Sequence, residues 1–306
     1  MGFFYALYFL ALWGMRKMIF PSLHLFLLHM SSLLFGGTAL FSKLLPFSAN
    51  DIILSRSLIS SILLGLFILF TRKQNFKIKS KKDAWFIFLS GLFLGLHLFA
   101  YFYAIKVSSI GIGVISLFTF PMITTLIEPA ILKTKPKVKD VVLGLFVLLG
   151  VFFIISDSGF HEGTVKGVLF GIISAVLYSF RNLIQKYRLN MYSPIPMLFY
   201  QMLITFCLML PFTTFSEVQI QPEEYGWMLI LSIFFTIIPH LAVIESLKSL
   251  DARSVSLILT LQVFYAIVFA FIIFNEELKL TIIFGSLVVI SAVGYESYRV
   301  RREAMY

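Results

Sequence analysis

Apolar residues occur along this chain in long continuous runs that are separated by short charged breaks. The runs are about 17–25 residues long, which is the length that an α-helix needs to cross the hydrocarbon core of a bilayer. Division of the sequence at the charged breaks predicts ten spans, at 21–44, 52–70, 84–105, 110–132, 140–156, 164–186, 195–214, 226–247, 254–274 and 280–298. We therefore expect an all-α polytopic membrane protein with short connections and no attached soluble domain.

The composition agrees with this class. Of 306 residues, 59% are hydrophobic and 13% are charged, whereas about 25% of the residues of a soluble domain are charged. A membrane β-barrel would show segments of roughly ten residues in which apolar and polar residues alternate, whereas the apolar runs of this chain are continuous. The single cysteine, Cys207, cannot form an internal disulfide. The sequence contains no His and Cys cluster with metal-ligand spacing, so we expect neither a metal nor another cofactor.

The positive charge follows the predicted topology. The net charge is +10, and most of the 25 Lys and Arg residues fall in breaks that the ten-span division places on one side, at 71–83, 133–139, 186–190, 248–253 and 299–303. The breaks at 157–163 and 215–225 on the other side are acidic. Because Lys and Arg loops stay in the cytoplasm, we expect a cell (inner) membrane protein with both termini cytoplasmic. We expect these basic residues to lie at the surface of the bilayer, and we do not expect the protein to bind nucleic acid.

The N-terminal run FFYALYFLALWGM, at 3–15, does not fit the ten-span division. Thirteen helical residues reach about 20 Å, which is short of the ~30 Å hydrocarbon core. We expect 1–20 to be an interfacial segment, and the alternative is that the native protein starts at Met15 or Met18. The rest of the chain divides into a first repeat (21–156), a second repeat (164–298) and a basic cytoplasmic tail (299–306).

The two halves of the chain resemble each other. FGGTALFSKLL (35–45) aligns with YSFRNLIQKYR (178–188), and LHLFAYFYAIK (96–106) aligns with PHLAVIESLK (239–248), which pairs His97 with His240. Each half holds five predicted spans, and an odd number places the second copy upside down in the membrane. We therefore predict two inverted five-helix repeats, an arrangement that is typical of transporters with a substrate site near the midplane.

Four segments carry a resemblance to a known family: Phe35-Gly36 through Lys43, Arg56 in SRSLISSILL, YAIKVSSIGIGVISLFTFPMITTLI (103–127) and FNEELKLTIIFGSLVVISAVG (274–294). In this order they resemble the drug/metabolite transporter (DMT) superfamily, specifically two EamA-type repeats. The second half departs from the pattern, with Gln201 where the early Arg would fall. The resemblance implies a ten-helix secondary transporter of small metabolites, often amino acids, with a central cavity.

Polar residues inside the predicted spans are the candidates for the site, because such groups are costly in lipid and face a cavity or another helix. His97 lies near the middle of its span, Tyr101 lies one turn later on the same face, and His240 follows Pro239. We expect the two histidines to line one cavity. Helix packing and proton coupling through a titrating imidazole are the alternatives.

Further polar residues lie elsewhere in the spans. Arg181 could hold a carboxylate or phosphate, or extend to the interface. Glu128 could pair with Arg181 as a gate or reach the surface, while Arg56, near the outer end of its span, suits a structural role. The predicted substrate-binding residues are His97, Tyr101, Tyr178, Arg181, His240, Gln262 and Tyr265, and the predicted gating or structural residues are Arg56, Glu128 and Gln201.

These features favour a secondary active transporter over an enzyme. The spans hold no paired carboxylates and no His-Glu-x-x-His element, so we expect no enzymatic activity. The expected cargo is a small organic metabolite, such as an amino acid or a similar zwitterionic or nucleoside-like solute, moved by alternating access. The sequence is compatible with transport that is coupled to protons or that works by exchange. It is also compatible with a monomer or a homodimer. The alternative function is a flippase for a lipid or lipid precursor with the same fold.

Overall fold

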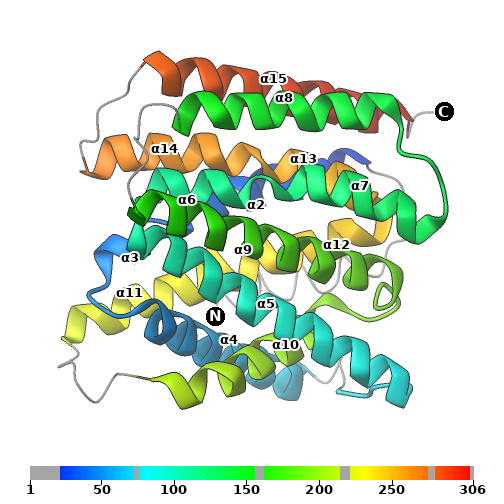
Figure 1. Cartoon of the computed structure of the whole chain (residues 1–306). Coiled ribbons are helices and arrows are strands. Elements are labelled where there is room, and N and C mark those ends of the chain that lie inside the picture. The colour runs from blue at the N-terminus through cyan, green and yellow to red at the C-terminus, as the bar shows by residue number, and fades with distance from the viewer. Residues whose placement is uncertain (1–20, 72–75, 156–161, 214–220, 275–279, 304–306) are drawn as a thin grey trace.

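The structure, a computed structural model, describes residues 21–71, 76–155, 162–213, 221–274 and 280–303 (Figure 1). Every regular element in these ranges is helical. The predicted interfacial segment 1–20 lies outside the described residues. The all-helical class predicted from the apolar runs is thus confirmed for the described part of the chain.

The first half of the chain contains α2 (Pro21–Thr38), α3 (Phe41–Leu44), α4 (Ala49–Thr71), α5 (Lys81–Val107), α6 (Ile110–Leu117), α7 (Phe120–Leu132) and α8 (Val138–Ile155). The second half contains α9 (Glu162–Tyr187), α10 (Pro194–Met209), the 3₁₀ turn η1 (Leu210–Phe212), α11 (Pro222–Ser232), the π-helical turn η3 (Ile233–Ile237), α12 (Ile238–Ser249), α13 (Ala252–Leu259), α14 (Leu261–Phe274) and α15 (Leu280–Glu303). Several of the element boundaries fall at the charged breaks of the sequence.

Four apolar runs that the sequence predicts as single spans are interrupted. The run 21–44 breaks at 39–40, between α2 and α3. The run 110–132 breaks at 118–119, just before Pro121, whose ring and missing N–H suit the first turn of α7. The run 254–274 breaks at Thr260, and the run 226–247 passes through the π-helical turn η3 just before Pro239. Breaks at membrane depth are tolerated where the freed backbone groups find partners inside the protein or line a cavity.

Within the described residues, seven helical stretches are long and apolar enough to cross a membrane: Leu23–Leu44, Ala49–Thr71, Lys81–Val107, Gly163–Tyr187, Pro194–Phe212, Pro222–Ser249 and Ala252–Ile273. Large apolar side chains on their outer faces are exposed, such as Leu69, Phe70 and Leu169. Such a surface suits contact with lipid. The count of ten spans and the inverted relation of the two halves stay predictions.

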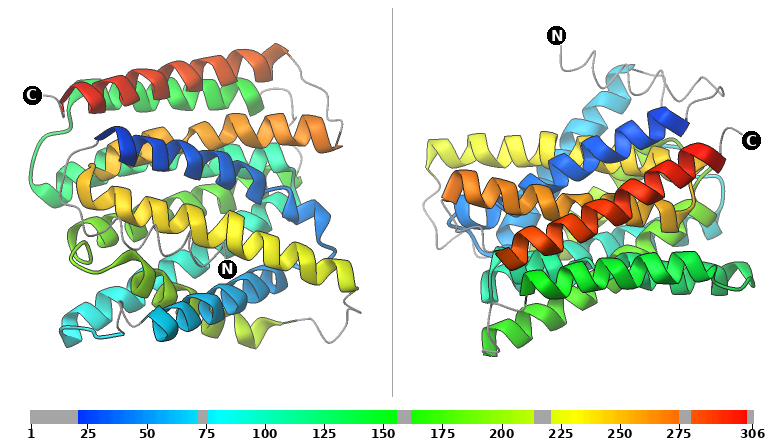
Figure 2. Two further views of the ribbon diagram at one scale, coloured as in Figure 1. Left: turned by 180° about the vertical axis from the view of Figure 1, so that it is seen from behind. Right: turned by 90° about the horizontal axis from the view of Figure 1, so that it is seen from above.

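The long helices run roughly in one direction across Figure 1, with α8 and α15 at one edge and α4 and α10 at the other (Figures 1 and 2). Between these two pairs, α2 packs against α12 and α14, and α9 packs against α5 and α6. The buried core is therefore built from both halves of the chain, and helices from opposite halves meet along its centre.

Small residues set the closest of these contacts. A Cβ added at Gly171 would lie 2.3 Å from the Cβ of Ser116, and one added at Gly91 would lie 2.8 Å from the Cβ of Ile204. Only a glycine lets the helices approach this far. The glycine spacings of α5 and α9 thus serve packing within the chain.

Candidate functional site

A cavity of about 30 Å³, lined almost entirely by buried residues, lies among the helices. This volume has room for about two water molecules. Its lining comes from helices of both halves and consists of Phe35, Thr38, Arg56, His97, Leu98, Tyr101, Leu117, Tyr178, His240 and Gln262. The lining combines aromatic and aliphatic side chains with polar ones, and the described residues that form it include no carboxylate. Leu117 and Gln262 lie beside the breaks at 118–119 and Thr260, so the interrupted helices meet at this cavity.

His97, on α5, is fixed by two contacts with Ser174 on α9. Its Nδ1 atom lies 3.1 Å from the Ser174 carbonyl oxygen and 2.8 Å from the Ser174 hydroxyl, which donates to the His97 carbonyl at 3.0 Å. A carbonyl oxygen can only accept, so this pattern assigns the proton to Nδ1. The neutral ring then offers Nε2 as an acceptor. Ser174 therefore orients the imidazole and sets its tautomer.

His240, on α12, is held from the other half of the chain by a backbone carbonyl one turn earlier in its own helical segment. Its Nδ1 lies 2.8 Å from the Thr236 carbonyl oxygen, and Phe35 meets the ring edge-on with the centroids 4.8 Å apart. The same reasoning places the proton on Nδ1 and leaves Nε2 as an acceptor. The two repeat-related histidines thus line one cavity in the same tautomer.

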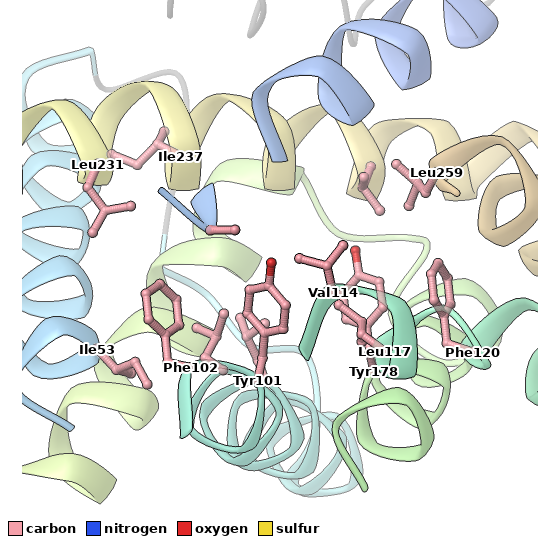
Figure 3. Packing of buried hydrophobic residues seen from close by; sticks show 14 of the residues in the cluster. Ile53, Tyr101, Phe102, Val114, Leu117, Phe120, Tyr178, Leu231, Ile237 and Leu259 are labelled. Atoms are coloured by element: carbon pink, nitrogen blue, oxygen red, sulfur yellow. The ribbon is translucent and has the colours of Figure 1, made fainter. Parts of the chain in front are cut away.

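Two tyrosines flank His97. The Tyr178 ring stacks on the imidazole with the centroids 4.5 Å apart, and the Tyr101 ring lies 6.3 Å away and nearly parallel. Figure 3 shows the two tyrosines with their hydroxyl groups pointing the same way, towards the helices across the core. An apolar or aromatic group in the cavity would therefore meet ring faces and two hydroxyls.

Arg56, on α4, is completely buried and lines the same cavity. Its Nε and Nη2 atoms donate to the Thr236 hydroxyl at 2.9 and 2.6 Å, and Nη2 also reaches the Phe235 carbonyl at 3.2 Å. Pro239, four residues after Phe235, has no N–H to donate to that carbonyl, which also accepts from the Thr38 hydroxyl at 3.3 Å. Nη1 has no hydrogen-bond partner among the described residues. Arg56 was expected to be structural near the outer end of its span, and the structure adds a cavity-lining position.

Arg181 lies apart from the cavity, in a polar network between α5, α9 and α10. It donates from Nε and Nη2 to the Gln201 side-chain oxygen at 3.3 and 2.7 Å, and from Nη1 to Asn182 at 2.9 Å. Gln201 in turn donates to Ser90 and Gln185. The expectation that Arg181 faces a solute does not match this geometry, since its donors are used within the helix bundle. Gln201 occupies a structural position.

Tyr265 and Glu128 also differ from expectation. Tyr265, on α14, does not line the cavity, and its Cβ packs 2.6 Å from where a Cβ at Gly36 would lie. Glu128, on α7, is buried and pairs with Arg253 at 3.0 Å. The expected pairing with Arg181, or an exposed position, is therefore wrong. The partner comes from the other half of the chain.

Glu128 belongs to a set of four charged residues, which we name the ion cluster: Glu128, Asp140, Arg253 and Arg299. Arg253 also contacts Asp140, and Asp140 also contacts Arg299. Glu128 further accepts from the backbone N–H groups of residues 252 and 253 at 2.9 and 3.0 Å, at the start of α13. A carboxylate is stabilised there by the free N–H groups and the helix dipole. The ion cluster joins α7 and α8 to α13 and α15.

Sequence reasoning missed several cavity residues. Ser174 and Thr236 orient the two histidines, while Phe35 and Thr38 line the wall. A signal for Phe35 was present, because the repeat alignment that pairs the histidines also pairs Phe35 with Tyr178. Thr236 gave no signal, since its role depends on the local π-helical turn.

The comparisons with known proteins agree with this architecture. One solved protein structure aligns with 92% of this chain and 98% of its own length, with a TM-score of 0.74 and 15% identity, a likeness that concerns the fold alone. The search of curated proteins finds no match. A model of the EamA-like transporter family matches at 22–156 and again at 165–295, which together are most of the chain. The chain therefore belongs to the EamA-like transporter family, within the DMT superfamily.

Proposed function

We propose that this protein is a secondary active transporter that moves a small organic metabolite across the cell (inner) membrane by alternating access. The observation that carries the proposal is the central cavity, which both halves of the chain build at their interrupted helices. Transporters commonly place the solute at such helix breaks, near the interface of two repeats.

The helix contacts support a two-fold relation between the repeats, as the proposed inverted arrangement requires. In the predicted correspondence, α2 matches α9, α4 matches α10, α5 matches α12, and α8 matches α15. The contact of α2 with α12 then has its counterpart in the contact of α9 with α5, while the contacts α4–α10 and α8–α15 are their own counterparts. A two-fold relation produces this pattern. It would let the halves exchange conformations and open the cavity to either side in turn.

The lining favours an amino acid or a similar zwitterionic or nucleoside-like solute. Phe35, Tyr101 and Tyr178 offer ring faces to an apolar group. The Nε2 atoms of the two histidines can accept from an amino group, and Gln262 can both donate and accept. Each of these polar side chains is at most 8% exposed, so their bonds to a solute would form away from water.

Reconstitution of the purified chain in liposomes tests the proposal. We expect counterflow exchange of radiolabelled amino acids from a metabolite panel, saturable and competed by the unlabelled solute. The lipid flippase alternative predicts instead that fluorescent phospholipids cross between leaflets faster than in protein-free liposomes. Lipid movement without any solute exchange would contradict the proposed function.

A further inference from the structure

We propose that Arg56 is the anion-binding group of the cavity and that the transported solute carries a single carboxylate. This inference rests on the proposed transport function and narrows its substrate class. It also gives Arg56 a role beyond its bonds to η3, and assigns to Arg56 the recognition that the sequence suggested for Arg181.

Among the described residues, the Arg56 guanidinium has no anionic partner, and its one charge-related contact there is with the ring of Phe102, 5.7 Å from the centroid, which offsets a buried charge only in part. The cavity lining includes no carboxylate, and among the described residues no ion pair involves Arg56. A buried cation without a counter-ion is strongly destabilising unless a partner arrives. The cavity therefore has an excess positive charge that an anionic solute would neutralise.

One nitrogen of the Arg56 guanidinium, Nη1, is left without a hydrogen bond to the described residues. Nε and Nη2 are held by Thr236 and by the Phe235 carbonyl, which fixes the plane of the group. Nη1 carries two N–H donors, is buried, and has no partner among the described residues. Buried donors in native proteins are nearly always paired. An oriented guanidinium with free donors beside a cavity is the arrangement that binds a carboxylate in proteins.

The surroundings favour a carboxylate over a phosphate. A phosphate carries up to two negative charges and needs several donors, whereas Arg56 is the single cation of the lining. The Nε2 atoms of His97 and His240 act as acceptors in the assigned tautomer and would face phosphate oxygens unfavourably. The same two acceptors suit an amino group next to a carboxylate. Phe35, Tyr101 and Leu98 suit an apolar remainder of the solute.

A carboxylate introduced into the cavity by mutation tests whether Arg56 lacks a counter-ion. This test does not require the natural solute to be known. Gln262→Glu places a nearly isosteric carboxylate in the same small cavity. We expect it to raise the thermal midpoint of the purified protein, because it supplies the missing counter-ion, and to lower the midpoint in an Arg56→Gln background. Equal lowering in both backgrounds would overturn the proposal. If Arg56→Gln does not fold, Arg56→Lys retains the charge, and Gln262→Glu should again be stabilising there.

Matched solutes test the chemistry directly. We would measure binding of benzoate and 4-methylpentanoate, each beside its neutral amide, to the full-length protein in detergent. The carboxylates should bind ~10- to 100-fold more tightly than the amides, the range expected of a hydrogen bond to a charged group. Arg56→Lys should reduce this preference, and Gln262→Glu should abolish it. Amides that bind as tightly as the carboxylates would overturn the proposal.

The two proposals fail in different ways. Counterflow of neutral solutes that is unaffected by Arg56→Lys would overturn the anion site and leave the transporter intact. If the Gln262→Glu coupling and the carboxylate preference hold but no solute crosses the liposome membrane, the anion site stands and the transport function is wrong.

Discussion

The Arg56 guanidinium and the Thr236 hydroxyl are joined by two hydrogen bonds, of 2.9 and 2.6 Å, across the interface between α4 and η3. The hydroxyl in turn donates to the Leu231 carbonyl at 2.8 Å, five residues earlier, which fits the wider turn of a π-helix. A cation from the first half of the chain is thus held by an irregular turn of the second half.

Thr236→Val should destabilise the protein by about 1–3 kcal/mol, because it leaves two donors of a buried cation without their acceptor. Thr205→Val is the matched control. Its hydroxyl is also buried, but bonds at 2.8 Å to the Gln201 carbonyl of its own helix, with no charged partner. Thermal unfolding in detergent measures both variants. Equal decreases in the thermal stability of the two variants would mean that the bonds between Thr236 and Arg56 add no stability.

Pro239→Ala should restore an N–H that can donate to the Phe235 carbonyl and so compete with Arg56 and Thr38, which both bond to that oxygen. We expect η3 to relax towards a regular α-helix, with retained or increased thermal stability and reduced solute exchange. A variant that transports as well as the wild type would show that the freed carbonyl is dispensable.

His97→Gln and His97→Leu separate two roles of the imidazole. If His97 bonds the solute or a cavity water, Gln should keep much of the transport and Leu should lose it, and this is the outcome that we expect. If His97 carries a coupling proton, both variants should lose accumulation driven by a pH gradient and keep counterflow exchange. Normal transport by His97→Leu in liposomes would reduce the residue to a packing role.

Glu128→Gln should weaken the ion cluster and open the protein on the side of the basic loops. The probe is Ser256→Cys in a Cys207→Ser background, since Ser256 is fully buried on α13 beside Thr124. We expect faster labelling of this cysteine by a maleimide that does not cross membranes. Lys248→Gln breaks the partly exposed pair with Glu245, outside the ion cluster, and should leave the labelling rate unchanged. Similar rates in both variants would argue against a closing role.

Labelling of introduced cysteines from either side of the membrane also tests the predicted topology. Single cysteines at Lys135 and at the C-terminal Arg302 should react from the cytoplasmic side only, and a cysteine at Glu223 from the outer side only. Labelling of all three from one side would contradict the odd number of spans predicted between Lys135 and Glu223, and with it the inverted arrangement.

The helices themselves could be predicted from the sequence, because continuous apolar runs between charged breaks leave few alternatives. The span expected at 52–70 is Ala49–Thr71 in the structure. The repeat alignment also brought His97 and His240 towards one cavity, which the structure shows, although their role in binding stays a prediction. The break at Thr260 could not be predicted, since it lies in an apolar run that contains no glycine or proline there.

The partners of buried charges were the least predictable part. Glu128 and Arg253 are far apart in the sequence, and their pairing depends on how α7 and α13 approach each other. Arg181 donates to Gln201 of α10 instead of facing the cavity, and the sequence pattern of α9 does not indicate this partner. Periodicity places a residue on a face of its own helix, and it does not say which helix covers that face.

The small cavity has a consequence for the rate of transport. Sites that enclose organic ligands measure about 300–1,000 Å³, and this cavity measures about 30 Å³. A solute cannot enter the conformation described here, so helices must separate before it binds. The observed association rate should then level off at high solute concentration, at the rate of opening. The apparent dissociation constant should exceed the intrinsic one by the inverse of the open fraction, and any variant that favours opening should bind more tightly with no new contact to the solute.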